Sequence, residues 1–125
     1  IPVLNRAIAS ILQYAQEGSP RLVLATTLAN GAAEEVFFRG ALYAAAGVDR
    51  PVLKSTAVYA LATLSTRNPA LVLASAVMGA LFGFQRQVTG GIQAPLLTHL
   101  TWSSLMLRYL PPLFSSADAA KSGAV

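Results

Sequence analysis

A long apolar segment, from about Arg21 to Ala46, is the feature that most restricts how this chain can fold. A bilayer crossing needs ~20 apolar residues of helix, and this segment is long enough to cross with some tilt. It nevertheless contains Glu34, Glu35 and Arg39. A charged residue at the centre of a membrane helix costs roughly 2.5–3.5 kcal/mol on insertion scales for Asp, Lys and Arg. Charges placed at that cost indicate a functional cluster inside a membrane helix.

The composition also indicates a membrane protein. Apolar residues make up 54% of the chain and charged residues 11%, whereas about a quarter of a typical soluble domain is charged. The formal charge of +4 comes from nine basic residues scattered singly among five acidic ones. This scatter argues against nucleic acid as a partner and favours contact with membrane lipid. The Ala-rich composition is compatible with a bacterial protein, so we expect an integral protein of a bacterial cytoplasmic membrane. The chain has no cysteine, which excludes disulfides and thiolate metal sites.

The predicted fold class is all-α, a transmembrane bundle of about four core helices preceded by an amphipathic helix. Turns rich in Gly and Pro separate the apolar segments. The helices are expected at residues 2–17, about 21–46, 52–64, 70–87 and 92–110. At ~1.5 Å per residue, the third is too short to cross the ~30 Å hydrocarbon core.

Three regions are expected along the chain. Residues 1–19 would form an amphipathic helix or the end of a preceding span. Residues 20–112 would form an intramembrane core, which ends where Pro111 and Pro112 stop the last helix. Residues 113–125, which are small and polar from Ser115 on, would form a flexible tail. The chain starts at Ile1, so we expect it to be part of a longer protein with further helices upstream.

Helical spacing separates the two glutamates. Residues four apart share a helix face, so Glu35 and Arg39 are expected to form an ion pair. Glu34 lies in a different column, with Asn30 and Phe38, and has no cation nearby in the sequence. An unpaired carboxylate of this kind can take and return a proton, as a general base does. The alternative is that all three charges form one buried network that only locks helices together.

His99, the only histidine of the chain, lies in the middle of the last predicted span. Ser103 follows one turn later on the same face, and Trp102 is adjacent. An intramembrane histidine can serve as a hydrogen-bonding partner of a neighbouring helix, or it can belong to the same site as Glu34. The sequence alone does not determine whether His99 and Glu34 meet.

Several other residues within the helices have structural explanations. Thr63, like Ser65, is expected to bond back to its own helix. The GxxxG pair Gly79 and Gly83 should allow close approach of another helix. Trp102 is expected to serve packing or the membrane interface.

Taken together, the motifs resemble the CPBP family. This family contains the CAAX proteases and bacteriocin-processing intramembrane proteins, including Rce1-like prenyl-protein proteases and domains similar to the lysostaphin-resistance protein A. The resemblance covers about residues 21–110. It is carried by Glu-Glu-x-x-x-Arg at 34–39 and by Thr-Gly-Gly-Ile-Gln-Ala-Pro-Leu-Leu-Thr-His at 89–99. The family's other two patterns are changed. In Phe-x-x-x-His, Tyr59 and Thr63 occupy the two named positions, and in His-x-x-x-Asn, Ser103 follows His99.

The resemblance implies roles for these residues. Glu34 would be the general base that activates water, and His99 would donate to the oxyanion. Glu35 and Arg39 would complete the first motif, with Thr63 and Ser103 as supporting residues. A hydroxyl at position 103 can still donate a hydrogen bond, but Thr63 cannot take up a proton as the family's histidine would. Zinc would normally need three protein ligands, and the one histidine and two glutamates here make a poor set.

Three functions therefore remain open. The first is an intramembrane endopeptidase that acts on a lipidated C-terminus, a bacteriocin leader or another membrane peptide or protein. The second is a weakened or inactive relative that binds such a peptide or partner, because loss of a proton-transfer group typically costs ~10²–10⁴ in rate. The third is a fragment of a proton-coupled transporter, since intramembrane Glu and His residues also build proton relays.

Overall fold

The computed structural model describes residues 1–123, including all their side chains except those of residues 14, 15 and 114–122. All regular secondary structure in this part of the chain is helical, so the all-α prediction is confirmed. The elements are α1 (Pro2–Glu17), α2 (Pro20–Glu34), η1 (Glu35–Leu42), α3 (Tyr43–Ala45), α4 (Pro51–Thr63), η2 (Leu64–Thr66), α5 (Pro69–Thr89) and α6 (Gln93–Ser122).

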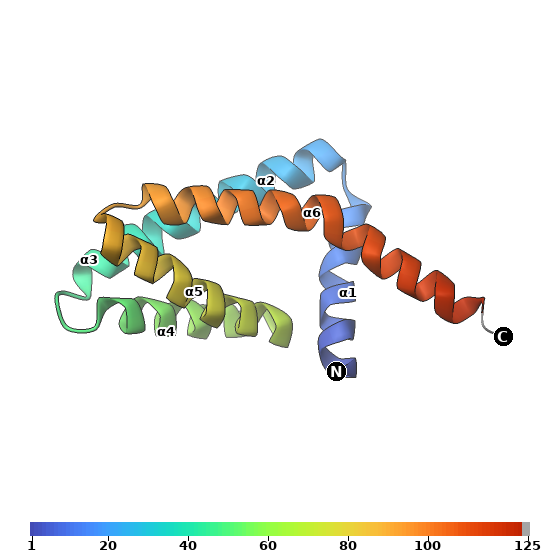
Figure 1. Cartoon of the computed structure of the whole chain (residues 1–125), viewed down its shortest axis with the longest axis horizontal. Coiled ribbons are helices and arrows are strands. Elements are labelled where there is room, and N and C mark those ends of the chain that lie inside the picture. Colours follow the sequence, from blue (N-terminus) through green and yellow to red (C-terminus); the bar gives the residue numbers. More distant parts are fainter. Residues whose placement is uncertain (124–125) are drawn as a thin grey trace.

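The core consists of two pairs of helices (Figure 1). Helices α2 and α6 lie side by side, and α4 and α5 form a second pair. The two pairs are joined by contacts of α5 with α6 and by contacts of α4 and α5 with η1, which continues α2. Helix α1 stands across one end of this core, and the C-terminal part of α6 extends away from it. Because α2, η1 and α3 follow one another without a break, the first motif lies within one continuous helical segment.

The distribution of side chains is inverted relative to a water-soluble protein. The largest side chains with almost no exposure include Arg39, Phe82 and Glu35. Large apolar side chains are exposed over the outer faces of α2, η1, α4, α5 and α6. Charged residues are almost never fully buried in soluble proteins unless they are paired. In a bilayer, by contrast, they normally face the interior of a bundle, so this arrangement fits a lipid-embedded bundle.

Among the described helices, α5 alone is both long and apolar enough to cross a membrane by length and composition. The spans expected at 21–46 and 92–110 do not meet that test and stay predictions. The first of them is interrupted where α2 ends at Glu34 and η1 begins.

Close approach of α4 and α5 depends on the GxxxG pair, as predicted. A Cβ atom added at Gly79 would lie 3.0 Å from Cγ2 of Thr56, and one added at Gly83 would lie 2.9 Å from Cγ1 of Val52. Real Cβ atoms essentially never make the second contact, so only glycine allows this spacing between the two helices.

The predicted end of the last helix is wrong. Helix α6 continues through Pro111 and Pro112 to Ser122 instead of stopping at the two prolines. Proline removes its own amide donor and disturbs the turn before it, which can kink a helix without ending it. Whether residues 113–125 are flexible stays a prediction.

Candidate active site

The segment that carries the first motif is a π-helix. In η1, hydrogen bonds reach five residues back, as from the amide of Tyr43 to the carbonyl of Phe38. Helix α5 supports this wide turn through Arg86, whose Nε donates to the carbonyl oxygen of Arg39 at 3.0 Å. The Arg86 guanidinium also lies 4.7 Å from the centre of the Tyr43 ring. Such π-turns are frequent at functional sites, and no pattern in the sequence predicted one here.

The predicted ion pair between Glu35 and Arg39 is confirmed. Nη1 of Arg39 lies 2.9 Å from Oε1 of Glu35, and both side chains are almost completely buried. The guanidinium lies 4.6 Å from the ring centre of Tyr59 and 5.1 Å from that of Phe82. Contact of a cation with aromatic rings is favourable and offsets part of the cost of burial.

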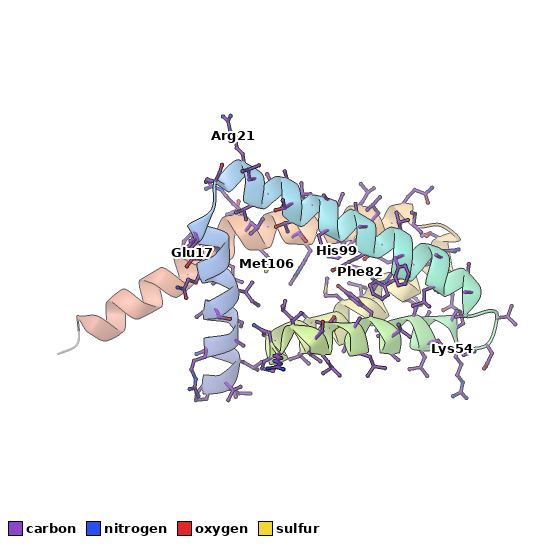
Figure 2. The ribbon with its side chains drawn as sticks, turned by 180° about the vertical axis from the view of Figure 1, so that it is seen from behind. Glu17, Arg21, Lys54, Phe82, His99 and Met106 are labelled. Atoms are coloured by element: carbon purple, nitrogen blue, oxygen red, sulfur yellow. The ribbon has the colours of Figure 1, made fainter. Side chains whose placement is uncertain are left out.

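His99 joins α6 to this pair. Its Nδ1 lies 2.7 Å from Oε1 of Glu35, and its ring stacks on Phe82 with centroids 5.0 Å apart. Figure 2 shows the side chains of His99 and Phe82 near one another inside the bundle. Gly31 of α2 faces the imidazole, and a Cβ added there would make an ordinary van der Waals contact of 3.5 Å with the ring. The Glu35 carboxylate, which is paired with Arg39, can only accept a hydrogen bond, so Nδ1 of His99 carries the hydrogen. Nε2 is then the ring nitrogen that faces the remaining partner of this histidine.

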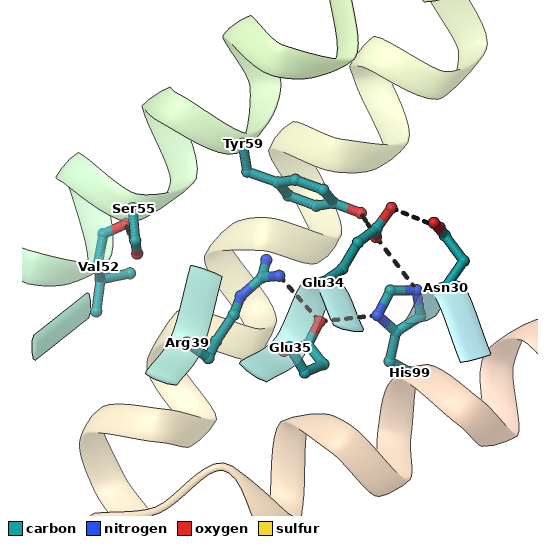
Figure 3. Close-up of polar contacts among 8 residues, drawn as sticks. All are labelled: Asn30, Glu34, Glu35, Arg39, Val52, Ser55, Tyr59 and His99. Carbon is teal, nitrogen blue, oxygen red and sulfur yellow. Dashed lines mark hydrogen bonds and ion pairs between the residues drawn. The ribbon is translucent and has the colours of Figure 1, made fainter. Parts of the chain in front are cut away.

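That remaining partner is Glu34. Its Oε2 lies 3.9 Å from Nε2 of His99 and accepts a hydrogen bond of 2.7 Å from the hydroxyl of Tyr59. Its Oε1 accepts one of 2.8 Å from Nδ2 of Asn30 (Figure 3). The two neighbouring glutamates thus have different surroundings. Glu35 is enclosed, whereas 27% of the Glu34 side chain is exposed.

Glu34 and His99 open onto the same cavity, which has a volume of about 550 Å³. A cavity of that size is in the range of ligand sites. Its wall also contains residues of α4 and α6 that the sequence had singled out. The lining includes Glu34, Tyr59, Thr63, His99, Trp102 and Ser103.

The supporting residues differ in what their side chains do. The hydroxyl of Thr63 donates to the carbonyl of Tyr59 at 2.8 Å, so the predicted bond back to its own helix is confirmed, as is that of Ser65 to Ala62 at 2.7 Å. Ser103 lies in the cavity wall on the same helix as His99. The roles of all these residues in chemistry stay predictions.

Sequence reasoning missed the contribution of Tyr59. The residue had been noted only as the counterpart of a phenylalanine in the second motif. The contact between Tyr59 and Glu34 joins residues 25 positions apart, so no helical spacing could predict it. Asn30 lies one turn before Glu34, and its column had been identified, although not its hydrogen bond.

The residues at the site do not fit a zinc ion. Oε1 of Glu35 already contacts both Arg39 and His99, and the described residues contain no group of three His, Cys, Asp or Glu side chains arranged to hold a metal. A structural zinc site uses four ligands and a catalytic one three plus water. We derive no step through a metal.

The fold and site define a helical bundle with an apolar exterior and a carboxylate–imidazole site at a cavity between its helices. The sequence profile of the type II CAAX prenyl endopeptidase Rce1-like family matches residues 16–105. The chain therefore belongs to this family of membrane-embedded proteases, as its motifs had indicated. No curated protein and no solved structure shows significant similarity to it. The match gives no support to the transporter alternative.

Proposed function

We propose that this protein is an intramembrane endopeptidase that hydrolyses peptide bonds of membrane-associated or lipidated, CAAX-like peptides with a water molecule activated by Glu34. One observation supports this most strongly. The Glu34 carboxylate and the His99 imidazole face one cavity with Oε2 and Nε2 3.9 Å apart, inside a bundle whose exterior is apolar.

The surroundings of Glu34 suit a general base. Each carboxylate oxygen has two acceptor sites, so Oε2 can hold a water while it accepts from Tyr59. Glu34 would take a proton from this water as the water oxygen attacks the carbonyl carbon of the peptide. It would then return the proton to the leaving amine. Asn30 and Tyr59 hold the carboxylate in place for both transfers.

His99 would assist from its position beside Glu34. Its Nδ1 hydrogen is directed at Glu35, so Nε2 donates to an oxyanion only when the ring is the imidazolium. Glu35 is paired with Arg39, so it would position His99 without reacting.

The alternative is a relative that binds a membrane peptide and does not cleave it. Thr63 stands where the family has a histidine, and its hydroxyl is bonded to the Tyr59 carbonyl. A binding protein would retain a membrane peptide in the cavity without turnover. In that case Thr63→His, which adds a proton-transfer group to the cavity wall, should produce measurable cleavage.

Glu34→Gln tests the proposal. We expect the variant protein in lipid vesicles to lose ~10²–10⁴ in kcat on fluorogenic membrane peptides, with and without a prenyl group, and to keep its affinity for them. Asp49→Asn removes a carboxylate that is 78% exposed and serves as the matched control. Equal unfolding midpoints for wild type and both variants would show that the fold is intact. Undiminished cleavage by Glu34→Gln, or no cleavage by the wild type, would overturn the proposal.

A further inference from the structure

Tyr59 places a phenolic hydroxyl at the reacting side of the site. Its oxygen lies 2.7 Å from Oε2 of Glu34, the same carboxylate oxygen that lies nearest Nε2 of His99. The residue comes from α4, lines the cavity and reaches Glu34 across the gap between two helices (Figure 3). The hydroxyl is therefore within reach of a molecule bound in the cavity beside Glu34 and His99.

The ring of Tyr59 is held in position. Its centre lies 4.6 Å from the Arg39 guanidinium and 4.6 Å from the centre of the Phe38 ring. Gly79 allows this packing, because an added Cβ would lie 3.3 Å from Cδ1 of Tyr59. A donor fixed before the reaction is the arrangement that electrostatic catalysis requires.

We infer that Tyr59 is a further catalytic residue, whose hydroxyl passes its hydrogen bond from Glu34 to the oxyanion that forms on the scissile carbonyl. The inference rests on the proposed function and adds to it a donor that the family's motifs do not contain. Before reaction, the hydroxyl donates to the Glu34 carboxylate.

The transfer accompanies the attack of water. The water oxygen forms a bond to the carbonyl carbon while its proton moves to Oε2 of Glu34, and the electron pair of the C=O π bond moves to the carbonyl oxygen. A protonated carboxyl is a poorer acceptor than the new oxyanion, so the hydroxyl of Tyr59 turns to the stronger acceptor. When the C–N bond breaks, its electron pair and the proton from Glu34 go to the amine. Tyr59 then donates to Glu34 again.

Two other donors at the site, His99 and Thr63, are less suited to this task. Nε2 of His99 has a hydrogen to donate only in the imidazolium form, because Nδ1 donates to Glu35. The hydroxyl of Thr63 is engaged with the carbonyl of Tyr59. The phenol of Tyr59 remains a neutral donor in either state of His99, so it can donate to the oxyanion throughout the reaction.

Tyr59→Phe removes only the hydroxyl, so its kinetics in lipid vesicles test the inference. Loss of one oxyanion donor typically lowers kcat by ~10²–10³, and we expect that loss with KM changed by less than about threefold. Tyr109→Phe makes the same chemical change on an exposed face of α6 and should retain wild-type kinetics. Melting curves of both variants check the fold.

A phosphinate peptide separates catalysis from mere positioning of Glu34. Its tetrahedral anion resembles the intermediate, so Tyr59→Phe should weaken its binding by about the same factor as kcat falls. Unchanged phosphinate affinity with a lower kcat would mean that Tyr59 only positions Glu34, and would overturn the inference. So would an unchanged kcat. A wild-type protein that cleaves none of the peptides would overturn the proposed function as well, which distinguishes the two failures.

Discussion

Nδ1 of His99 and Oε1 of Glu35 lie 2.7 Å apart, although 64 positions separate the two residues in the chain. The same oxygen of Glu35 accepts a hydrogen bond of 2.9 Å from Arg39. One buried oxygen atom therefore connects the π-helix with α6. Its negative charge compensates the guanidinium and fixes which nitrogen of the imidazole faces the cavity.

Removing the charge of Glu35 should destabilise the protein strongly. Glu35→Gln keeps the shape of the side chain but leaves the buried guanidinium of Arg39 without a counterion. We expect a loss of ~3–5 kcal/mol in the free energy of unfolding, measured by denaturant titration in detergent micelles. Asp49 and Lys54 form an exposed ion pair at 3.4 Å, and Asp49→Asn should cost less than ~1 kcal/mol. Similar losses for the two variants would contradict a structural role for the buried pair.

Gly83→Ala should push α4 and α5 apart. The added methyl group would meet Cγ1 of Val52 at 2.9 Å, and overpacking of this kind costs typically ~1–3 kcal/mol. The double variant Gly83→Ala with Val52→Ala removes the colliding atom. In a double-mutant cycle based on unfolding, we expect Val52→Ala to relieve a large part of the Gly83→Ala penalty. Strictly additive effects would show that this contact does not set the spacing of the helices.

Asn68 has two separable tasks. Its Oδ1 accepts from the amides of Ala70 and Leu71 at the start of α5, and its Nδ2 donates to the carbonyl of Ala7 in α1 at 2.9 Å. Asn68→Asp retains the acceptor and loses the donor, whereas Asn68→Ala loses both. We expect both variants to speed hydrogen exchange in α1, and only the alanine variant to lose ~1 kcal/mol of stability through the cap. Unchanged exchange in α1 for both variants would mean that Asn68 does not hold this helix.

Some of the site could be predicted from the sequence because it depends on contacts within one helix. The spacing of Glu35 and Arg39 predicted their ion pair, and the spacing of Gly79 and Gly83 predicted a close helix contact. The composition predicted an all-α fold, and the motifs predicted a family that the comparison then supported.

The rest depends on contacts between helices, which spacing cannot supply. Two glutamates were available to His99, and only the arrangement of α6 against η1 shows that its nearest partner is Glu35. The bond from Tyr59 to Glu34 arises only once α4 lies against η1. Helix α6 is longer than the sequence predicts, because it continues through two prolines that often end a helix.

The wide turn of η1 makes the length of this segment as informative as its residues. Shortening the chain by one residue directly after Gly40 would keep every letter of Glu-Glu-x-x-x-Arg. It would nevertheless remove the extra residue that the i to i+5 turns of η1 require and let the segment close as an ordinary α-helix, without the wide turn whose Arg39 carbonyl Arg86 contacts. A sequence one residue shorter here would thus preserve the motif and lose the turn that Arg86 supports.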